Sequence, residues 1–158
     1  MHHFSFAVPS AVALETLAEF APVVEIGAGS GYWAGLLRER AVDVVALDAR
    51  PPSAQGQRGA IDVSSNRFFA STFTHVAAGE PADLARHPDR TLFLCWPHSA
   101  AEEAGRAWDA ECLEHYRGNT VIYVGESAGR TATAHAPHGV TSTAEFQRQL
   151  SESFRCPK

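Results

Sequence analysis

The sequence predicts a doubly wound α/β fold, in which a mostly parallel sheet of five or more strands has helices on both faces. Short, almost continuously apolar runs at residues 23–26, 42–47, 91–96 and 120–124 alternate with helical patterns. Such runs are typical of parallel strands that are buried on both faces. Because 158 residues are the length of one domain, we expect a single domain over residues 1–158.

The first half of the chain begins with a helix. Ser10 can cap this helix and Pro22 ends it, so the expected span runs to about Phe20. After the strand at 23–26, a second helix is expected over 32–40.

The second half repeats this alternation of strands and helices. Its last helix carries Phe146, Leu150 and Phe154 at a spacing of four residues, which places them on one helix face. The expected elements, in order, are a weak strand at 73–77, a short helix closing at 84–87, a strand at 91–96, a helix at 100–116, a strand at 120–124 and a helix at 143–154.

Composition excludes several classes of protein. Apolar residues make up 45% of the chain and charged residues 20%, which is an ordinary globular composition. No apolar run approaches the roughly 20 residues that a membrane helix needs, so no membrane partner is expected. The formal net charge of −5 disfavours a long footprint on duplex DNA.

The cysteines and the N-terminus favour a cytoplasmic protein. Cys95, Cys112 and Cys156 form an odd set without a C-x-x-C pair, so neither a disulfide framework nor a zinc knuckle is expected. The N-terminus has no basic region followed by an apolar stretch, so no signal peptide is predicted. The histidines lack H-x-x-x-H spacing, and no metal site is expected.

The most informative segment is Glu25-Ile26-Gly27-Ala28-Gly29-Ser30-Gly31-Tyr32-Trp33, in which a strand ends, three alternate glycines follow and a helix begins. Glycines allow the backbone to turn tightly and to approach a ligand closely. Asp48, at the end of the next strand, is placed to accept hydrogen bonds from both hydroxyls of a ribose. The pattern therefore predicts a site for a nucleoside.

The glycine spacing distinguishes two classes of nucleoside ligand. A dinucleotide fingerprint, G-x-G-x-x-G, would need glycine at position 32, where Tyr32 stands. The spacing here is G-x-G-x-G, with Glu25 two residues before the first glycine. It resembles motif I of the class I S-adenosylmethionine-dependent methyltransferases. The resemblance implies a Rossmann-like fold that binds S-adenosyl-L-methionine, with the glycine loop against the methionine part of the cofactor.

The resemblance covers most of the chain and implies further binding residues. Asp48 matches the ribose-binding acid of the family, and Glu80 matches a residue that often contacts the adenine, with Asp83 as the competing candidate. The chain also looks like a small, poorly characterised group of methyltransferase-like proteins. The cofactor-binding residues that the resemblance implies are Glu25, Gly27, Ala28, Gly29, Gly31, Tyr32, Asp48 and Glu80.

The acceptor side of the site is expected at the ends of the fourth and fifth strands. Trp96 and Pro97 are expected to contact the substrate, and His98 and Glu126 are the candidate catalytic groups that receive the acceptor proton. Family members that methylate amino groups of nucleic acids have Asp or Asn, two prolines and an aromatic residue, whereas this chain has Cys95-Trp96-Pro97-His98. A small-molecule acceptor is therefore favoured over a nucleic acid.

The C-terminus departs from the family pattern. The family fold normally ends in an antiparallel hairpin, which is expected to be short or absent because the chain stops at Lys158, soon after the last helix. The sheet would then have an open edge, which favours a homo-oligomer. Two other functions stay open, namely a catalytically degenerate subunit that binds or assembles, and a nicotinamide-dinucleotide-binding oxidoreductase.

Overall fold

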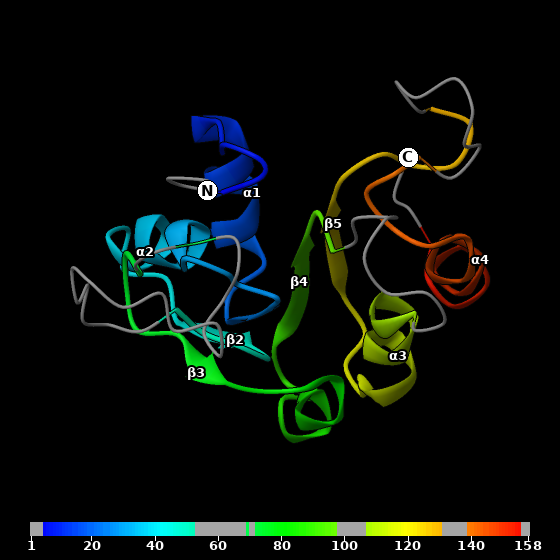
Figure 1. Cartoon of the computed structure of the whole chain (residues 1–158). Coiled ribbons are helices and arrows are strands. Elements are labelled where there is room, and N and C mark those ends of the chain that lie inside the picture. The colour runs from blue at the N-terminus through cyan, green and yellow to red at the C-terminus, as the bar shows by residue number, and fades with distance from the viewer. Residues whose placement is uncertain (1–4, 53–68, 70–71, 98–106, 131–138, 156–158) are drawn as a thin grey trace.

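The sheet is built from parallel strands in the order β3-β2-β1-β4-β5 (Figure 1). A computed structural model of the chain describes residues 5–52, 69, 72–97, 107–130 and 139–155. The strands within these residues are β1 (Val23–Ile26), β2 (Val44–Asp48), β3 (Ala77–Ala78), β4 (Thr91–Cys95) and β5 (Val121–Val124).

Helices cover both faces of the sheet, which confirms the doubly wound α/β fold. One face packs against α1 and α2, and the other against η1, α3 and α4. Figure 1 shows α1 and α2 on the left and α3 and α4 on the right. The bounds are α1 (Ala11–Glu19), α2 (Tyr32–Arg38), the 3-10 helix η1 (Pro81–Arg86), α3 (Trp108–His115) and α4 (Ala144–Ser153).

The core has two layers because successive side chains of a strand point to opposite faces. Val23 and Phe93 pack in the layer that contains Leu17 of α1. Val24 packs in the other layer, with Phe146 of α4. Each fully buried side chain of this kind stabilises the fold by about 1.5–3 kcal/mol. Replacing Phe93 by alanine would cost about 3–5 kcal/mol, which includes the cavity left behind.

The strand order reverses beside β1. Val23 is paired with Val44 of β2 on one side and with Thr91 of β4 on the other. The chain therefore leaves β1 toward one edge of the sheet and reaches the opposite edge only later, through β4 and β5. In open parallel sheets, ligands bind beyond the carboxyl ends of the strands at such a reversal.

Local signals located several elements correctly. The Ser10 hydroxyl accepts a hydrogen bond from the backbone N–H of Ala13 at 3.2 Å and caps α1, as the sequence predicts. Thr143 caps α4 in the same way. The strand β1 spans the predicted residues 23–26.

The third strand is shorter than predicted and lies later in the chain. The sequence indicated residues 73–77, whereas β3 contains only Ala77 and Ala78. The backbone N–H of Phe73 donates to the carbonyl of Ser30 at 2.8 Å, and Arg38 donates to the side chain of Thr74 at 2.7 Å. These bonds tie the segment to the start of α2, so its pairing with β2 begins only at Ala77.

The chain continues from β5 to α4, and no strand follows in the part that the structure describes. The C-terminal hairpin is therefore absent there, as predicted. Within the described residues β5 pairs with β4 alone. The search of those residues found no helix with the length and apolar character needed to cross a bilayer. Residues 98–106, which include the first part of the predicted fourth helix, lie outside the description.

Candidate functional site

The glycine loop joins β1 to α2 at the carboxyl edge of the sheet. Gly27, Gly29 and Gly31 have φ angles of 71°, 54° and 70°. Residues with a Cβ rarely adopt this left-handed conformation, so the alternating glycines are required by the path of the backbone. The spacing that the sequence singled out is therefore a conformational requirement, whatever the loop binds.

Three backbone N–H groups of the loop donate hydrogen bonds to acceptors within the protein. Ala28 donates to the carbonyl of Leu47 at 2.9 Å, and Gly31 donates to the carbonyl of Ala28 at 2.8 Å. Gly29 donates to Oδ2 of Asp48 at 2.8 Å. A pyrophosphate-binding loop instead directs such groups toward the ligand. The geometry thus disfavours a dinucleotide.

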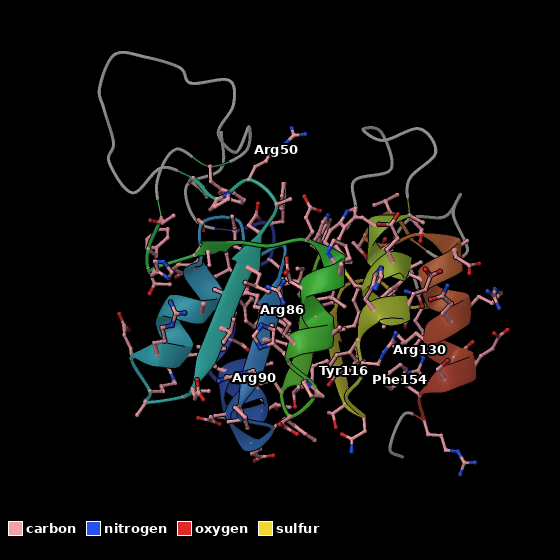
Figure 2. All side chains as sticks on the ribbon, turned by 90° about the horizontal axis from the view of Figure 1, so that it is seen from below. Arg50, Arg86, Arg90, Tyr116, Arg130 and Phe154 are labelled. Atoms are coloured by element: carbon pink, nitrogen blue, oxygen red, sulfur yellow. The ribbon has the colours of Figure 1, made fainter. Side chains whose placement is uncertain are left out.

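Asp48 ends β2 beside this loop and is only 8% exposed. Its Oδ2 accepts the N–H of Gly29, and its Oδ1 accepts the N–H of Arg50 at 2.8 Å. Hydrogen bonds to an ionised acceptor are roughly twice as strong as neutral ones, so this pair holds the carboxylate against the loop. Figure 2 shows the side chain of Arg50 directed away from the sheet at this edge.

Glu25 is buried in the middle of β1, on the face that packs against α2. Its carboxyl group accepts a hydrogen bond from the backbone N–H of Ala34, in the first turn of α2. Gly31 has no side chain that could cap this helix, so Glu25 satisfies one of the N–H groups at its start. The second oxygen, Oε2, has no hydrogen-bond partner among the described residues.

Burial has a large effect on the proton affinity of this carboxyl group. It raises the pKa of Glu25 to about 8, although the hydrogen bond from Ala34 and the charge of Arg38 act in the opposite direction. Near pH 7 the group is therefore mostly protonated and neutral.

Aromatic rings lie against two of the loop glycines. A Cβ at Gly27 would stand 2.8 Å from Cη2 of Trp108, and one at Gly29 would stand 2.5 Å from Cε2 of Phe69. Phe6 meets Phe69 edge-to-face, with 5.7 Å between the ring centroids. Sequence analysis missed Trp108 and Phe69, because no local pattern shows that residues so distant in the chain meet the loop.

Tyr32 follows the loop directly and begins α2. Its ring meets that of Phe73 edge-to-face at 4.9 Å. The predicted ligand-contacting residue is therefore placed at the loop and held by an aromatic neighbour.

Trp96 follows β4 and has an unusual backbone conformation, with a φ angle of 52°. A positive φ is rare for a bulky residue and stores strain, which often marks a functional site. Its backbone N–H donates to the carbonyl of Val124 at 2.8 Å. Pro97 is buried beside it, and His98 lies outside the described residues. Burial raises the pKa of the preceding Cys95 thiol to about 12, so this thiol is neutral near pH 7.

Two predicted acidic residues take part in backbone capping. The carboxylate of Glu126 accepts the N–H of Val140 at 2.8 Å, which fixes the segment before α4. The side chain of Glu80 accepts the N–H of Asp83, while Asp83 accepts the N–H of Glu80 in return. Both glutamates thus lie at the expected strand ends, and the carboxylate of each already accepts a hydrogen bond from a backbone N–H group.

The structure brings the loop, Glu25 and Asp48 into direct proximity and places Trp96 at the end of the neighbouring strand. Among the residues that it describes, no three His, Cys, Asp or Glu side chains converge as a metal site would require. Comparison of the chain with protein-family models, curated proteins and solved structures found no match.

Proposed function

We propose that the chain binds S-adenosyl-L-methionine at the carboxyl ends of β1 and β2 and transfers its methyl group to a small-molecule acceptor. The supporting observation is the bond between Gly29 and Asp48 at the reversal of strand order. It joins the glycine loop to a buried acid at the position where a ribose would lie. The engaged N–H groups of the loop favour a nucleoside without a pyrophosphate over a dinucleotide.

The acids at the loop fit such a ligand. S-adenosyl-L-methionine carries a positive sulfonium and an ammonium group. Glu25 is mostly protonated near pH 7 without a ligand, and a nearby positive charge favours its ionised form. The buried Oε2 atom of Glu25 has no partner within the described residues, although an unsatisfied polar atom is costly. We assign Asp48 to the ribose, Glu25 to the charged part of the ligand and Glu80 to the adenine.

When bound, S-adenosyl-L-methionine supplies an electrophilic methyl group, whose bond to sulfur breaks as the acceptor forms its new bond. The main role of the protein is then to position the two reactants, because holding them in line removes much of the entropic barrier. Trp96 and Pro97 would place the acceptor beside the loop. An acceptor that carries a proton releases it to His98, to Glu126 or to water.

A second candidate is a protein of this fold that binds or assembles without transferring a methyl group. The capping bonds of Glu80 and Glu126 favour it, because both carboxylates already have structural roles. The rings of Phe69 and Trp108 also account for two of the glycines without any ligand.

Thermal melting with S-adenosylmethionine, S-adenosylhomocysteine and NADH tests the donor site. A ligand at about 100 times its Kd stabilises the folded state by roughly 2.7 kcal/mol. In a domain of this size that raises the Tm by several degrees. We expect a shift with the two sulfur compounds and none with NADH. A shift with NADH alone would indicate the oxidoreductase, and no shift at all would leave the assembly protein.

Matched variants locate the site. Asp48→Asn removes the charge beside the loop and should weaken S-adenosylmethionine binding at least tenfold. Asp43→Asn is the control, because Asp43 is an exposed partner of Arg90 at the opposite ends of the strands. Equal affinities of the two variants would rule out the assignment of Asp48.

A further inference from the structure

Aromatic side chains from separate segments gather at the glycine loop. Phe69 lies on Gly29 and Trp108 on Gly27, while Phe6 lies against Phe69. We call the following six side chains the aromatic rim: Phe6, Tyr32, Phe69, Phe73, Trp96 and Trp108. They come from the N-terminal segment, the start of α2, the residues before β3, the end of β4 and the start of α3.

The rim is attached to the loop rather than scattered over the surface. The backbone N–H of Phe73 donates to the carbonyl of Ser30 at 2.8 Å, and its ring meets Tyr32. Trp96 directly follows β4, the strand that pairs with β1: Glu25 is paired with Phe93, and Trp96 stands three residues after Phe93. Contacts thus connect five of the six residues with the loop, and Trp96 directly follows the strand that pairs with β1.

Part of this aromatic surface remains in contact with solvent. Phe6 is 37% exposed and Phe73 is 48% exposed, and Trp96 and Trp108 are half-buried. Grouped apolar surface of this kind on a soluble domain marks a binding site more often than scattered apolar residues do. Here it lies at the edge of the sheet where ligands of this fold bind.

Two ionisable groups of β1 and β4 favour an uncharged ligand at the rim. Glu25 is buried and Cys95 is partly buried, and this burial keeps both of them neutral near pH 7 when no charged ligand is bound. The carboxylate of Asp48 already accepts the backbone N–H groups of Gly29 and Arg50. Recognition at the rim itself would therefore depend on ring stacking and apolar contact.

We propose that the aromatic rim binds a planar, uncharged aromatic molecule of one or two rings, and that this molecule is the methyl acceptor. The role as acceptor rests on the proposed function, whereas binding at the rim does not. Edge-to-face and offset contacts between aromatic rings add binding free energy beyond that of the apolar surface they bury. A saturated molecule of the same size lacks this contribution to the binding free energy.

A titration with 2-naphthol and its saturated counterpart, decahydro-2-naphthol, tests the proposal without any methyl donor. The readout is the NMR signals of the three indole N–H groups, assigned by Trp→Phe variants. We expect 2-naphthol to bind about tenfold more tightly than the saturated compound and to shift the signals of Trp96 and Trp108. The signal of Trp33 should not shift, because this indole is buried and donates to the carbonyl of Ala7.

Phe6, which precedes α1, and Phe20, which caps its C-terminal end, provide a matched pair of variants. Phe6→Ala should weaken 2-naphthol binding several-fold, whereas Phe20→Ala should leave it unchanged, although Phe20 is 43% exposed. Equal binding of the two compounds, or equal effects of the two substitutions, would overturn the proposal. Because no donor is present, a failure here leaves the result of the melting experiment with S-adenosylmethionine untouched.

Discussion

The ring of Phe69 lies on the backbone of Gly29, so that a Cβ at position 29 would come within 2.5 Å of the ring carbon Cε2. Gly29 and Phe69 are far apart in the chain, because α2 and β2 lie between them. The contact explains why position 29 has no room for a Cβ. The positive φ of Gly29 is a separate requirement. The two requirements can be separated by experiment.

Gly29→Ala should destabilise the protein more than Gly129→Ala. Gly129 also has a positive φ, of 77°, but a Cβ there would meet no atom within 4 Å. The control should therefore cost only backbone strain, about 1–2 kcal/mol. Gly29→Ala should add about 1–3 kcal/mol of steric overlap. Denaturant unfolding of both variants measures the difference, and equal free energies would show that Phe69 moves aside without cost.

Asp109 joins α3 to α4 through the cap of the latter. Its carboxylate is fully buried and accepts the backbone N–H of Thr143 at 2.6 Å and the Thr143 hydroxyl at 2.8 Å. Asp109→Asn should lower the free energy of unfolding by about 1–3 kcal/mol, because one of the two Thr143 donors is left without a good acceptor. Asp89→Asn, at an exposed position before β4, is the control and should change stability by less than about 0.5 kcal/mol.

Glu25 should make the protein less stable as the pH rises. Its pKa is raised by burial from 4.5 to about 8, so the folded state holds a proton that the unfolded state releases above pH 4.5. The stabilising effect is complete below pH 4.5 and is lost as the pH rises through about 8. The slope is on the order of 1 kcal/mol per pH unit within this window.

Glu25→Gln keeps a neutral side chain at every pH and should flatten this dependence. Melting curves of the wild type and the variant between pH 5 and pH 8.5 provide the measurement. Parallel curves would mean that another group sets the pH dependence, or that Glu25 titrates at an ordinary pKa.

At position 96, we expect glycine to give a more stable protein than alanine, which is the reverse of the usual order. Because its φ is 52°, alanine at this position keeps the strain and glycine relieves it. Both substitutions remove the ring, so the comparison isolates the backbone. Trp96→Gly should be more stable than Trp96→Ala by about 1 kcal/mol. Ala13→Gly in α1 serves as the ordinary case, in which glycine destabilises a helix by about 1 kcal/mol.

Much of the fold could be predicted from the sequence because its signals are local. The caps at Ser10 and Thr143 act within one helical turn. The strand at 23–26 is apolar enough to be recognised by itself. The third strand was misplaced because the bond between Phe73 and Ser30 joins distant segments, and no pattern within residues 73–77 indicates it.

The candidate site was predicted in part. The sequence located the glycine loop and Asp48, since each follows an apolar strand, and the structure brings them into contact at 2.8 Å. It did not indicate that the carboxylate of Glu126 is engaged by Val140, or that Trp108 lies on Gly27. Such contacts depend on how the elements pack, and many sequences are compatible with the same packing.

The sequence by itself determined the alternation of strands and helices, the left-handed glycine positions and the acid that ends β2, because short-range sterics and hydrogen bonding specify them. Only the tertiary structure decided which side chains surround the loop. Strand order, register and helix packing bring Phe69 and Trp108 to it from separate segments. Contacts between distant segments leave no periodic trace in the chain, since they are selected by the shape of the whole core.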